Sequence, residues 1–200
     1  MLLALCLGAG LAAGDAAAKK KKHKGATVFA GSVSPNLAIP STPTGPAPIA
    51  SSTLTVGKKF KGKVVGDVNV TGIQTTGDTA DAAGDLAMEV VAPNGKAVLI
   101  FSSSLGGQSI GPLTLDDDTA TSVCDSAALN CRDPDQTLIR PFAGTANLNF
   151  LFNGDSGPLV AFNGVPMRGT WTALMWDFSS GGTSVLNSWG LQITAARPVT

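Results

Sequence analysis

The sequence predicts an all-β fold, an antiparallel jelly-roll β-sandwich of about eight strands. In several segments apolar residues recur at every second position, as in a strand with one buried face. Asn-Gly dipeptides, which favour the tight turns of hairpins, lie between these segments. The 200 residues also include 24 glycines and 12 prolines without a collagen-like period, and no segment has the pattern of an amphipathic helix.

Each expected strand or turn follows from its own residues. Alternation or a short apolar run predicts strands at 64–70, 86–90, 97–101, 148–152 and 189–193. Asn-Gly pairs predict turns at 94–95, 153–154 and 163–164. Because 44% of the residues are hydrophobic and 14% are charged, residues 51–197 are expected to form one domain with a core of its own.

Residues 1–18 have the features of an export signal. The apolar run from Met1 to Ala13 is too short to span a bilayer, and Ala16 and Ala18 give the small-x-small pattern of a signal peptidase site. We therefore expect a signal peptide, a secreted or cell-envelope protein, and no transmembrane span in the mature chain. Because no positive charge precedes the apolar run, a weakly inserted membrane anchor is the alternative.

Residues 19–50 are expected to be a basic and then proline-rich disordered linker. They carry five lysines, five prolines and no acidic residue, a composition that favours a solvated, extended chain. Residues 51–200 carry nine basic and thirteen acidic residues, so the zero net charge of the whole chain is a cancellation. The lysine run is either a solvated spacer or a contact for anionic lipid or a cell-surface polymer, and no specific binding to nucleic acid is predicted.

The cysteines predict one disulfide. Cys6 lies in the predicted signal peptide, and Cys124 and Cys131 form an even pair in an exported, oxidising context. Their bridge would close a short surface loop. Two free thiols in a reducing compartment are the alternative, and a zinc ion would need more ligands than this loop offers.

The segment from Gly154 to Pro158, Gly-Asp-Ser-Gly-Pro, is similar to the nucleophile segment of chymotrypsin-like proteases with one glycine missing. A serine nucleophile needs a general base, and the single histidine, His23, lies in the lysine run outside residues 51–197. This position excludes a Ser/His/Asp triad within that domain, and no motif supports a Ser-Lys dyad. We therefore predict no catalytic residue and interpret the segment around Ser156 as a turn between strands.

Motifs in the last third of the chain resemble the end of a known family, the P domain, also called the P/Homo B domain. The motifs that match it in order and spacing are Pro158–Gly164, Gly169–Thr172 and Leu186–Ile193. Further upstream, the segments that resemble the family are Gly84–Leu86, Ala92–Gly95 and Leu115–Asp118. The resemblance covers about residues 51–195, and residues 75–83 and the segment between Cys124 and Cys131 depart from the family's pattern.

The P domain follows the subtilisin-like catalytic domain of proprotein convertases and carries no triad of its own. The resemblance implies a jelly-roll sandwich with family-motif core positions at Gly169, Trp171, Asn187 and Trp189. It also implies a secreted non-catalytic module that binds or stabilises an extracellular partner, such as a separately encoded protease. The alternatives are a fragment or relic of a subtilisin-like serine endopeptidase, with proteolysis by family association only, and an adhesion module that binds a surface polymer.

Three consecutive aspartates are the strongest remaining chemical signal. Calcium takes about six to eight oxygen ligands, and calcium sites also occur in some proteases that contain a P domain. The candidate ligands of a structural calcium ion are Asp85, Asp116, Asp117 and Asp118. Weaker candidates are Asp78, Asp81 and Asp177. A solvated acidic turn without a metal is the alternative.

The remaining motif residues are expected to have structural roles more than binding roles. Trp171 and Trp189 are expected in the core, where each indole N–H needs a hydrogen-bond partner, and a ligand-stacking face is the alternative. Asn187 and Ser188 are expected to cap a turn before the last strand.

Overall fold

The structure is a computed structural model, and it describes residues 26–41, 49–77, 85–102, 109–118, 138–139, 155–156, 158–177 and 183–197. We refer to these residues as the described part of the chain. The predictions that lie outside the described part are the signal peptide, the lysine run, the disulfide between Cys124 and Cys131, the strand at 148–152, the turn at 153–154, and Asp78 and Asp81.

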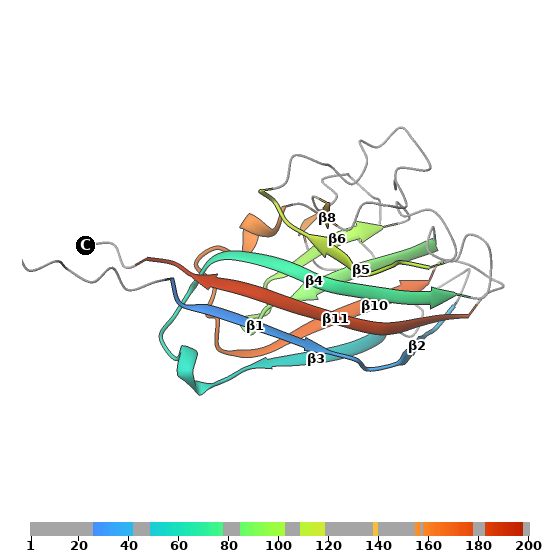
Figure 1. Ribbon diagram of the computed structural model, residues 1–200, viewed down its shortest axis with the longest axis horizontal. Coiled ribbons are helices and arrows are strands. Elements are labelled where there is room, and N and C mark those ends of the chain that lie inside the picture. Colours follow the sequence, from blue (N-terminus) through green and yellow to red (C-terminus); the bar gives the residue numbers. More distant parts are fainter. Residues whose placement is uncertain are drawn as a thin grey trace, which may run out of the picture.

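The described part forms two β-sheets around one core, which confirms the all-β sandwich (Figure 1). The first sheet contains, in order, β1 (Val28–Val33), β11 (Ser184–Ala195), β4 (Val65–Gly77), β7 (Leu113–Leu115) and β8 (Leu138–Ile139), with β2 (Leu37–Ile39) paired to β11. The second sheet contains β3 (Ala50–Val56), β10 (Gly169–Asp177), β5 (Leu86–Val91), β6 (Ala97–Ser102) and β9 (Asp155–Ser156). Pairing is antiparallel except between β6 and β9 and between β7 and β8.

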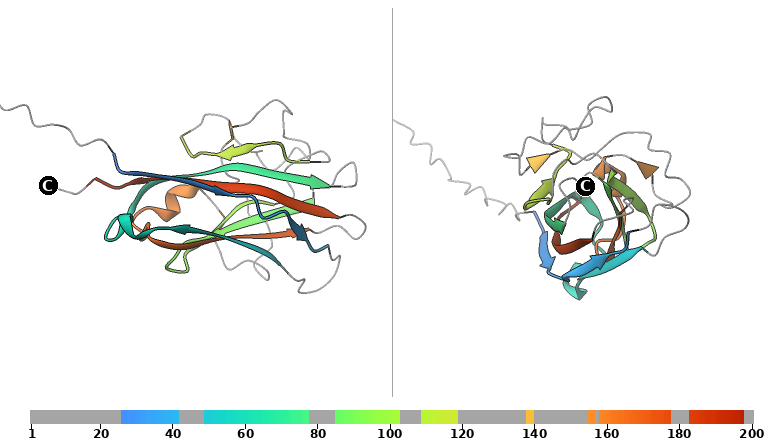
Figure 2. Two further views of the ribbon diagram at one scale, coloured as in Figure 1. Left: turned by 60° about the horizontal axis from the view of Figure 1, so that its bottom comes forward. Right: turned by 90° about the vertical axis from the view of Figure 1, so that its right-hand side faces the viewer.

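Four predicted strands lie where the apolar alternation, or in β6 the short apolar run, placed them: β4, β5, β6 and β11. Their inward residues come from both sheets and form one cluster between them, as the end view in Figure 2 shows for the two layers. The turn at Asn94 and Gly95 joins β5 to β6, with Gly95 at a φ of 86° that favours glycine. Two short 3₁₀ helices, η1 (Lys58–Phe60) and η3 (Leu159–Phe162), complete the described part.

Residues 28–39 are a correction to the predicted linker, because they form β1 and β2 on the edge of the first sheet. Val28 to Val33 pairs with β11 in register, and the partly buried side chains of Phe29 and Val33 pack against the core. Pro35 and Pro40 lie outside the two strands, so they do not interrupt the ladder. The folded part therefore begins well before residue 51.

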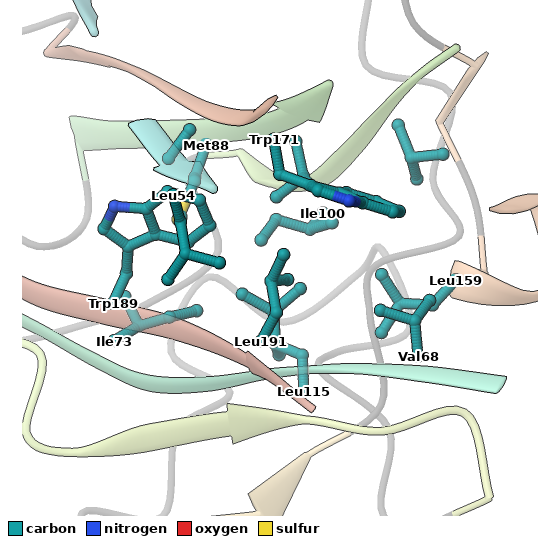
Figure 3. Packing of buried hydrophobic residues seen from close by; sticks show 14 of the residues in the cluster. Leu54, Val68, Ile73, Met88, Ile100, Leu115, Leu159, Trp171, Trp189 and Leu191 are labelled. Atoms are coloured by element: carbon teal, nitrogen blue, oxygen red, sulfur yellow. The ribbon is translucent and has the colours of Figure 1, made fainter. Parts of the chain in front are cut away.

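Trp171 and Trp189 are fully buried in the core (Figure 3). The indole Nε1–H of Trp171 donates to the Met167 carbonyl at 3.0 Å, and its ring meets the ring of Phe162 edge-on at 5.3 Å. The Nε1–H of Trp189 donates to the Ser52 hydroxyl at 2.9 Å, which joins β11 of the first sheet to β3 of the second. Both tryptophans therefore belong to the scaffold.

The expected turn cap at Asn187 and Ser188 is wrong, because both residues lie within β11. The register between β11 and β4 shifts on both sides of Ser188, and its hydroxyl donates to the Gly72 carbonyl at 2.8 Å. The polar side chains thus mark a β-bulge in a long strand, a feature that resembles a turn in sequence. Close packing continues at Gly190, where an added Cβ would lie 2.6 Å from the Gly31 carbonyl oxygen.

Candidate functional site

The loop between β3 and β4 presents four exposed lysines, Lys58, Lys59, Lys61 and Lys63. Phe60 lies among them with its side chain 1% exposed, and its ring meets that of Phe29 edge-on at 5.6 Å. Short backbone bonds shape the loop, because the N–H of Lys61 donates to the Lys58 carbonyl and that of Lys63 to the Phe60 carbonyl. A buried aromatic anchor and backbone bonds therefore hold the backbone of the loop that carries the lysines.

Arg168 and Arg197 lie at the same end of the sandwich as these lysines. The Met167 N–H donates to the Lys63 carbonyl at 3.0 Å, which places Arg168 beside the loop. The Ala196 N–H donates to the Val64 carbonyl at 2.9 Å, which places Arg197 there as well. In Figure 1 this end lies at the left, where β1 begins and β11 ends. We call the following residues the basic end: Lys58, Lys59, Lys61, Lys63, Arg168 and Arg197.

The basic end gathers nearly all the positive charge of the described part. The one further cation among the residues with described side chains, Lys96, lies in the β5–β6 hairpin, whose Pro93 faces Gly169 at the start of β10. Thr27, near the start of the described part, also lies at this end, because its carbonyl accepts a bond from the Ala195 N–H. The lysine run at 19–24 precedes it in the sequence and lies outside the described part.

The charges of the basic end have no carboxylate partner within the described part. None of its six side chains forms an ion pair there, and Lys59 makes only a cation–π contact, 4.9 Å from the centre of the Phe60 ring. All six are exposed. Unpaired cations held on one surface repel each other, and an anion that spans several of them relieves this repulsion.

Four aspartates form an acidic corner on the flank of the first sheet: Asp67, Asp116, Asp117 and Asp118. Asp116 follows β7 and accepts bonds from the Asn69 side-chain amide at 3.1 Å and from the Asp118 N–H at 2.8 Å. Asp117 accepts the Leu159 N–H at 3.0 Å and the Val160 N–H at 2.6 Å, which are the first two N–H groups of η3. The three consecutive aspartates therefore form a hydrogen-bonded turn. Asp117 caps the 3₁₀ helix η3, which comes from a distant part of the sequence.

The capping bonds predict different roles for two adjacent aspartates. Asp117→Asn removes one acceptor from a pair of helix-capping bonds and is expected to lower the free energy of unfolding by about 1–2 kcal/mol. Asp118→Asn makes the same change of charge at an exposed side chain without such bonds, and we expect an effect within about 0.5 kcal/mol. Urea denaturation of both variants measures the difference, and equal losses would contradict the capping role.

Asp67 in β4 is the carboxylate with a perturbed pKa in this corner. Burial raises the pKa of Asp67 above its usual 3.8, and the negative charges of Asp118, Asp116 and Asp117 raise it further, against the Val68 N–H, which lowers it. A carboxyl group whose pKa is raised by folding stabilises the fold at pH values below its ordinary pKa of 3.8. This contribution disappears as the pH rises through the raised pKa.

The raised pKa of Asp67 predicts the direction in which its substitution changes the melting temperature. At about pH 7 Asp67→Asn removes a destabilising charge, so we expect the variant to melt at a higher temperature than the native protein. At about pH 3 both forms are neutral at this position and the difference should vanish. Calorimetry at the two pH values measures this, and a stabilisation that is the same at both would contradict the electrostatic cause.

The structure does not assemble the predicted calcium ligands. Asp85 immediately precedes β5 of the second sheet, where Leu86 pairs with Asp177, whereas Asp116 follows β7 in the first sheet. Across the described residues, no group of three or more His, Cys, Asp or Glu side chains is arranged to hold a metal ion. Both oxygens of Asp116 and of Asp117 already accept protein hydrogen bonds. These residues do not fit a shared calcium ion as the sequence predicted.

Calcium binding elsewhere on the chain stays a prediction. If calcium is a structural ligand, the melting temperature of the protein rises in millimolar calcium and falls with a chelator. Asp117→Asn serves as the control, because its capping defect persists in either condition. An unchanged melting temperature would leave the acidic corner as a hydrogen-bonded turn without a metal.

The other residues that the sequence offered as site candidates have structural roles. Asp155 and Ser156 form β9, which is a short strand beside β6 and not the predicted turn. Asp177 is buried and accepts the Ser184 hydroxyl at 3.0 Å. The basic end could not be recognised in the sequence, because Arg168 and Arg197 lie far from the loop lysines along the chain and join them only in the fold.

In the part of the chain that the structure describes, no helix is long and apolar enough to cross a membrane. Neither a protein-family model nor a curated protein matches this sequence. The P-domain resemblance therefore rests on the motifs quoted above.

Proposed function

We propose that this protein is an exported, non-catalytic binding module that attaches to a polyanionic partner through the basic end. The observation that carries the proposal is the set of six exposed cations at one end of the sandwich, without a carboxylate partner in the described part. The proposal favours the surface-binding alternative from the sequence over a catalytic role.

The ordered backbone of the lysine loop favours binding of a polyanion. The backbone of the loop is held by Phe60 and by backbone bonds to Met167, before β10, and to Ala196, after β11, so little ordering of the backbone is needed when an anion binds. Binding of this kind releases counterions, so its affinity falls steeply as the salt concentration rises. The acidic corner borders the basic end, because Asp67 pairs with Thr194 near the end of β11, so a bound polyanion is confined to the cations.

The test compares two variants with the same change in net charge. The site variant replaces Lys58, Lys59, Lys61 and Lys63 by glutamine. The control variant introduces glutamate at four exposed positions in the opposite half of the sandwich, Ser34, Ala38, Gln74 and Thr76. Affinity for soluble polyphosphate is measured for both by titration at several salt concentrations.

We expect the native protein to bind polyphosphate with a strong salt dependence. The site variant should lose about tenfold or more in affinity, with a slope of log K against log salt smaller by about 0.7–0.9 for each lost contact. The control variant should change by less than about threefold. Equal losses in the two variants, or no binding by the native protein, would overturn the proposal.

Association with a separately encoded subtilisin-like protease is a second proposal, supported by the P-domain motifs. These motifs contain Trp171 and Trp189, whose burial suits a scaffold role and leaves the contact surface unspecified. A pull-down of secreted proteins with the full chain tests it. Recovery of a subtilisin-like protease would support it, whereas a protein set without one would remove it, together with the relic interpretation.

A further inference from the structure

Three cations of the basic end lie at the end of the second sheet. Val56 ends β3 and pairs with Gly169 at the start of β10. Lys58 and Lys59 follow β3 and Arg168 precedes β10, so these three cations lie at the same end of this sheet. Their side chains are exposed and have no carboxylate partner within the described part. The second sheet therefore presents a group of available positive charges at this end.

The acidic corner lies beside the same end of the sandwich, but in the first sheet. Asp67 in β4 pairs with Thr194, one residue before the end of β11. Val68 points into the core, so the partly buried side chain of Asp67 lies on the outer face of the first sheet. Besides burial, three carboxylates raise the pKa of Asp67, and the exposed Asp118 has the largest effect among them. Negative charge on this outer face therefore reaches the border of the basic end.

The distance between the two sheets determines which anions can use these cations. Packed sheets lie about 10 Å apart, and the Debye length at physiological ionic strength is about 8 Å. A single anionic chain that lies along the end of the second sheet is therefore largely screened from Asp67 and Asp118. A flat anionic surface that contacts the whole basic end also meets the acidic corner, where like charges repel. The charge pattern thus favours a narrow ligand over a broad one.

We propose that the basic end binds a single linear polyanion in solution, and that Asp67 and Asp118 exclude flat anionic surfaces such as a lipid bilayer. This inference rests on the proposed function and deepens it, because it names the shape of the partner and two residues that determine specificity. Asp116 and Asp117 are set apart by the hydrogen bonds that hold the turn and cap η3. A lysine near an anionic surface raises the affinity about fivefold, and a carboxylate held there lowers it by a similar factor.

The experiment measures the same variants with two anionic probes. The protein, purified in its exported form, is sedimented with vesicles of equal parts phosphatidylglycerol and phosphatidylcholine, and in parallel is titrated with soluble linear polyphosphate. Asp67→Asn with Asp118→Asn removes two negative charges and keeps the shape of both side chains. The control, Gln74→Lys with Thr76→Lys, changes the net charge by the same amount at two exposed positions of β4. These positions lie about 20 Å farther along the strand, well beyond the Debye length.

We expect the double asparagine variant to bind the vesicles about tenfold or more tightly than the native protein, whereas its polyphosphate affinity rises by less than about threefold. The control variant should raise either affinity by less than about threefold. An equal rise for the two probes, or an unchanged vesicle affinity, would overturn the role of the two aspartates. If polyphosphate binding still depends on the loop lysines in that case, the proposed function stands, and if the native protein does not bind polyphosphate, both fail.

Discussion

Trp171→Ala is expected to lower the free energy of unfolding by about 3–5 kcal/mol, because it removes the largest kind of side chain from a fully buried position. The indole packs edge-on against Phe162 with ring centres 5.3 Å apart. Strands from both sheets surround it, so the cavity cannot close by the movement of one loop (Figure 3). A loss of this size is a large share of the stability of an ordinary domain.

Trp171→Phe is the control for this prediction. It keeps an aromatic ring beside Phe162 and loses the bond from Nε1 to the Met167 carbonyl, so a loss of about 1–2 kcal/mol is expected. Urea denaturation of the full chain, followed by tryptophan fluorescence and circular dichroism, measures both variants. An alanine variant that loses less than about 1 kcal/mol would show that the core does not depend on this side chain.

Trp171 also connects the core to the basic end. Its indole N–H holds the Met167 carbonyl, and the Met167 N–H holds the Lys63 carbonyl in the lysine loop. Two hydrogen bonds therefore link this buried residue to the loop. The loop lysines, in contrast, are exposed, and their replacement should affect binding far more than stability.

The strand pattern could be predicted because it is local. β4, β5 and β11 contain alternating apolar and more polar residues over a short window, and β6 is a short apolar run, so each can be recognised from its own residues. β1 has the same period, in Phe29, Gly31 and Val33, but the neighbouring lysines and prolines made its segment resemble a linker. Its pairing depends on β11, which lies far away in the sequence.

The candidate site could not be predicted in the same way, because it depends on contacts between distant segments. Lys63, Arg168 and Arg197 become neighbours only when β4, β10 and β11 align at one end. The same holds for Asp67, whose pKa is raised partly by three aspartates that β7 brings alongside β4. Asp85 failed as a partner of those aspartates, because its strand belongs to the other sheet.

The hydrogen bond between Trp189 and Ser52 should be the most consequential polar contact between the two sheets. Trp189→Phe removes the donor and leaves the buried Ser52 hydroxyl without its partner, so we expect a loss of about 2–3 kcal/mol, part of it from the smaller ring. Ser52→Ala leaves the indole N–H unpaired at a fully buried position, with an expected loss of about 1–2 kcal/mol.

A double-mutant cycle tests whether the bond itself carries these losses. If it does, the variant with both substitutions should lose about 1 kcal/mol less than the sum of the single losses, because it leaves neither group unpaired. Ser51→Ala, one residue away at an exposed position, should change stability by less than about 0.5 kcal/mol. Strict additivity would mean that Trp189 acts through its ring and that the bond to Ser52 contributes no stability.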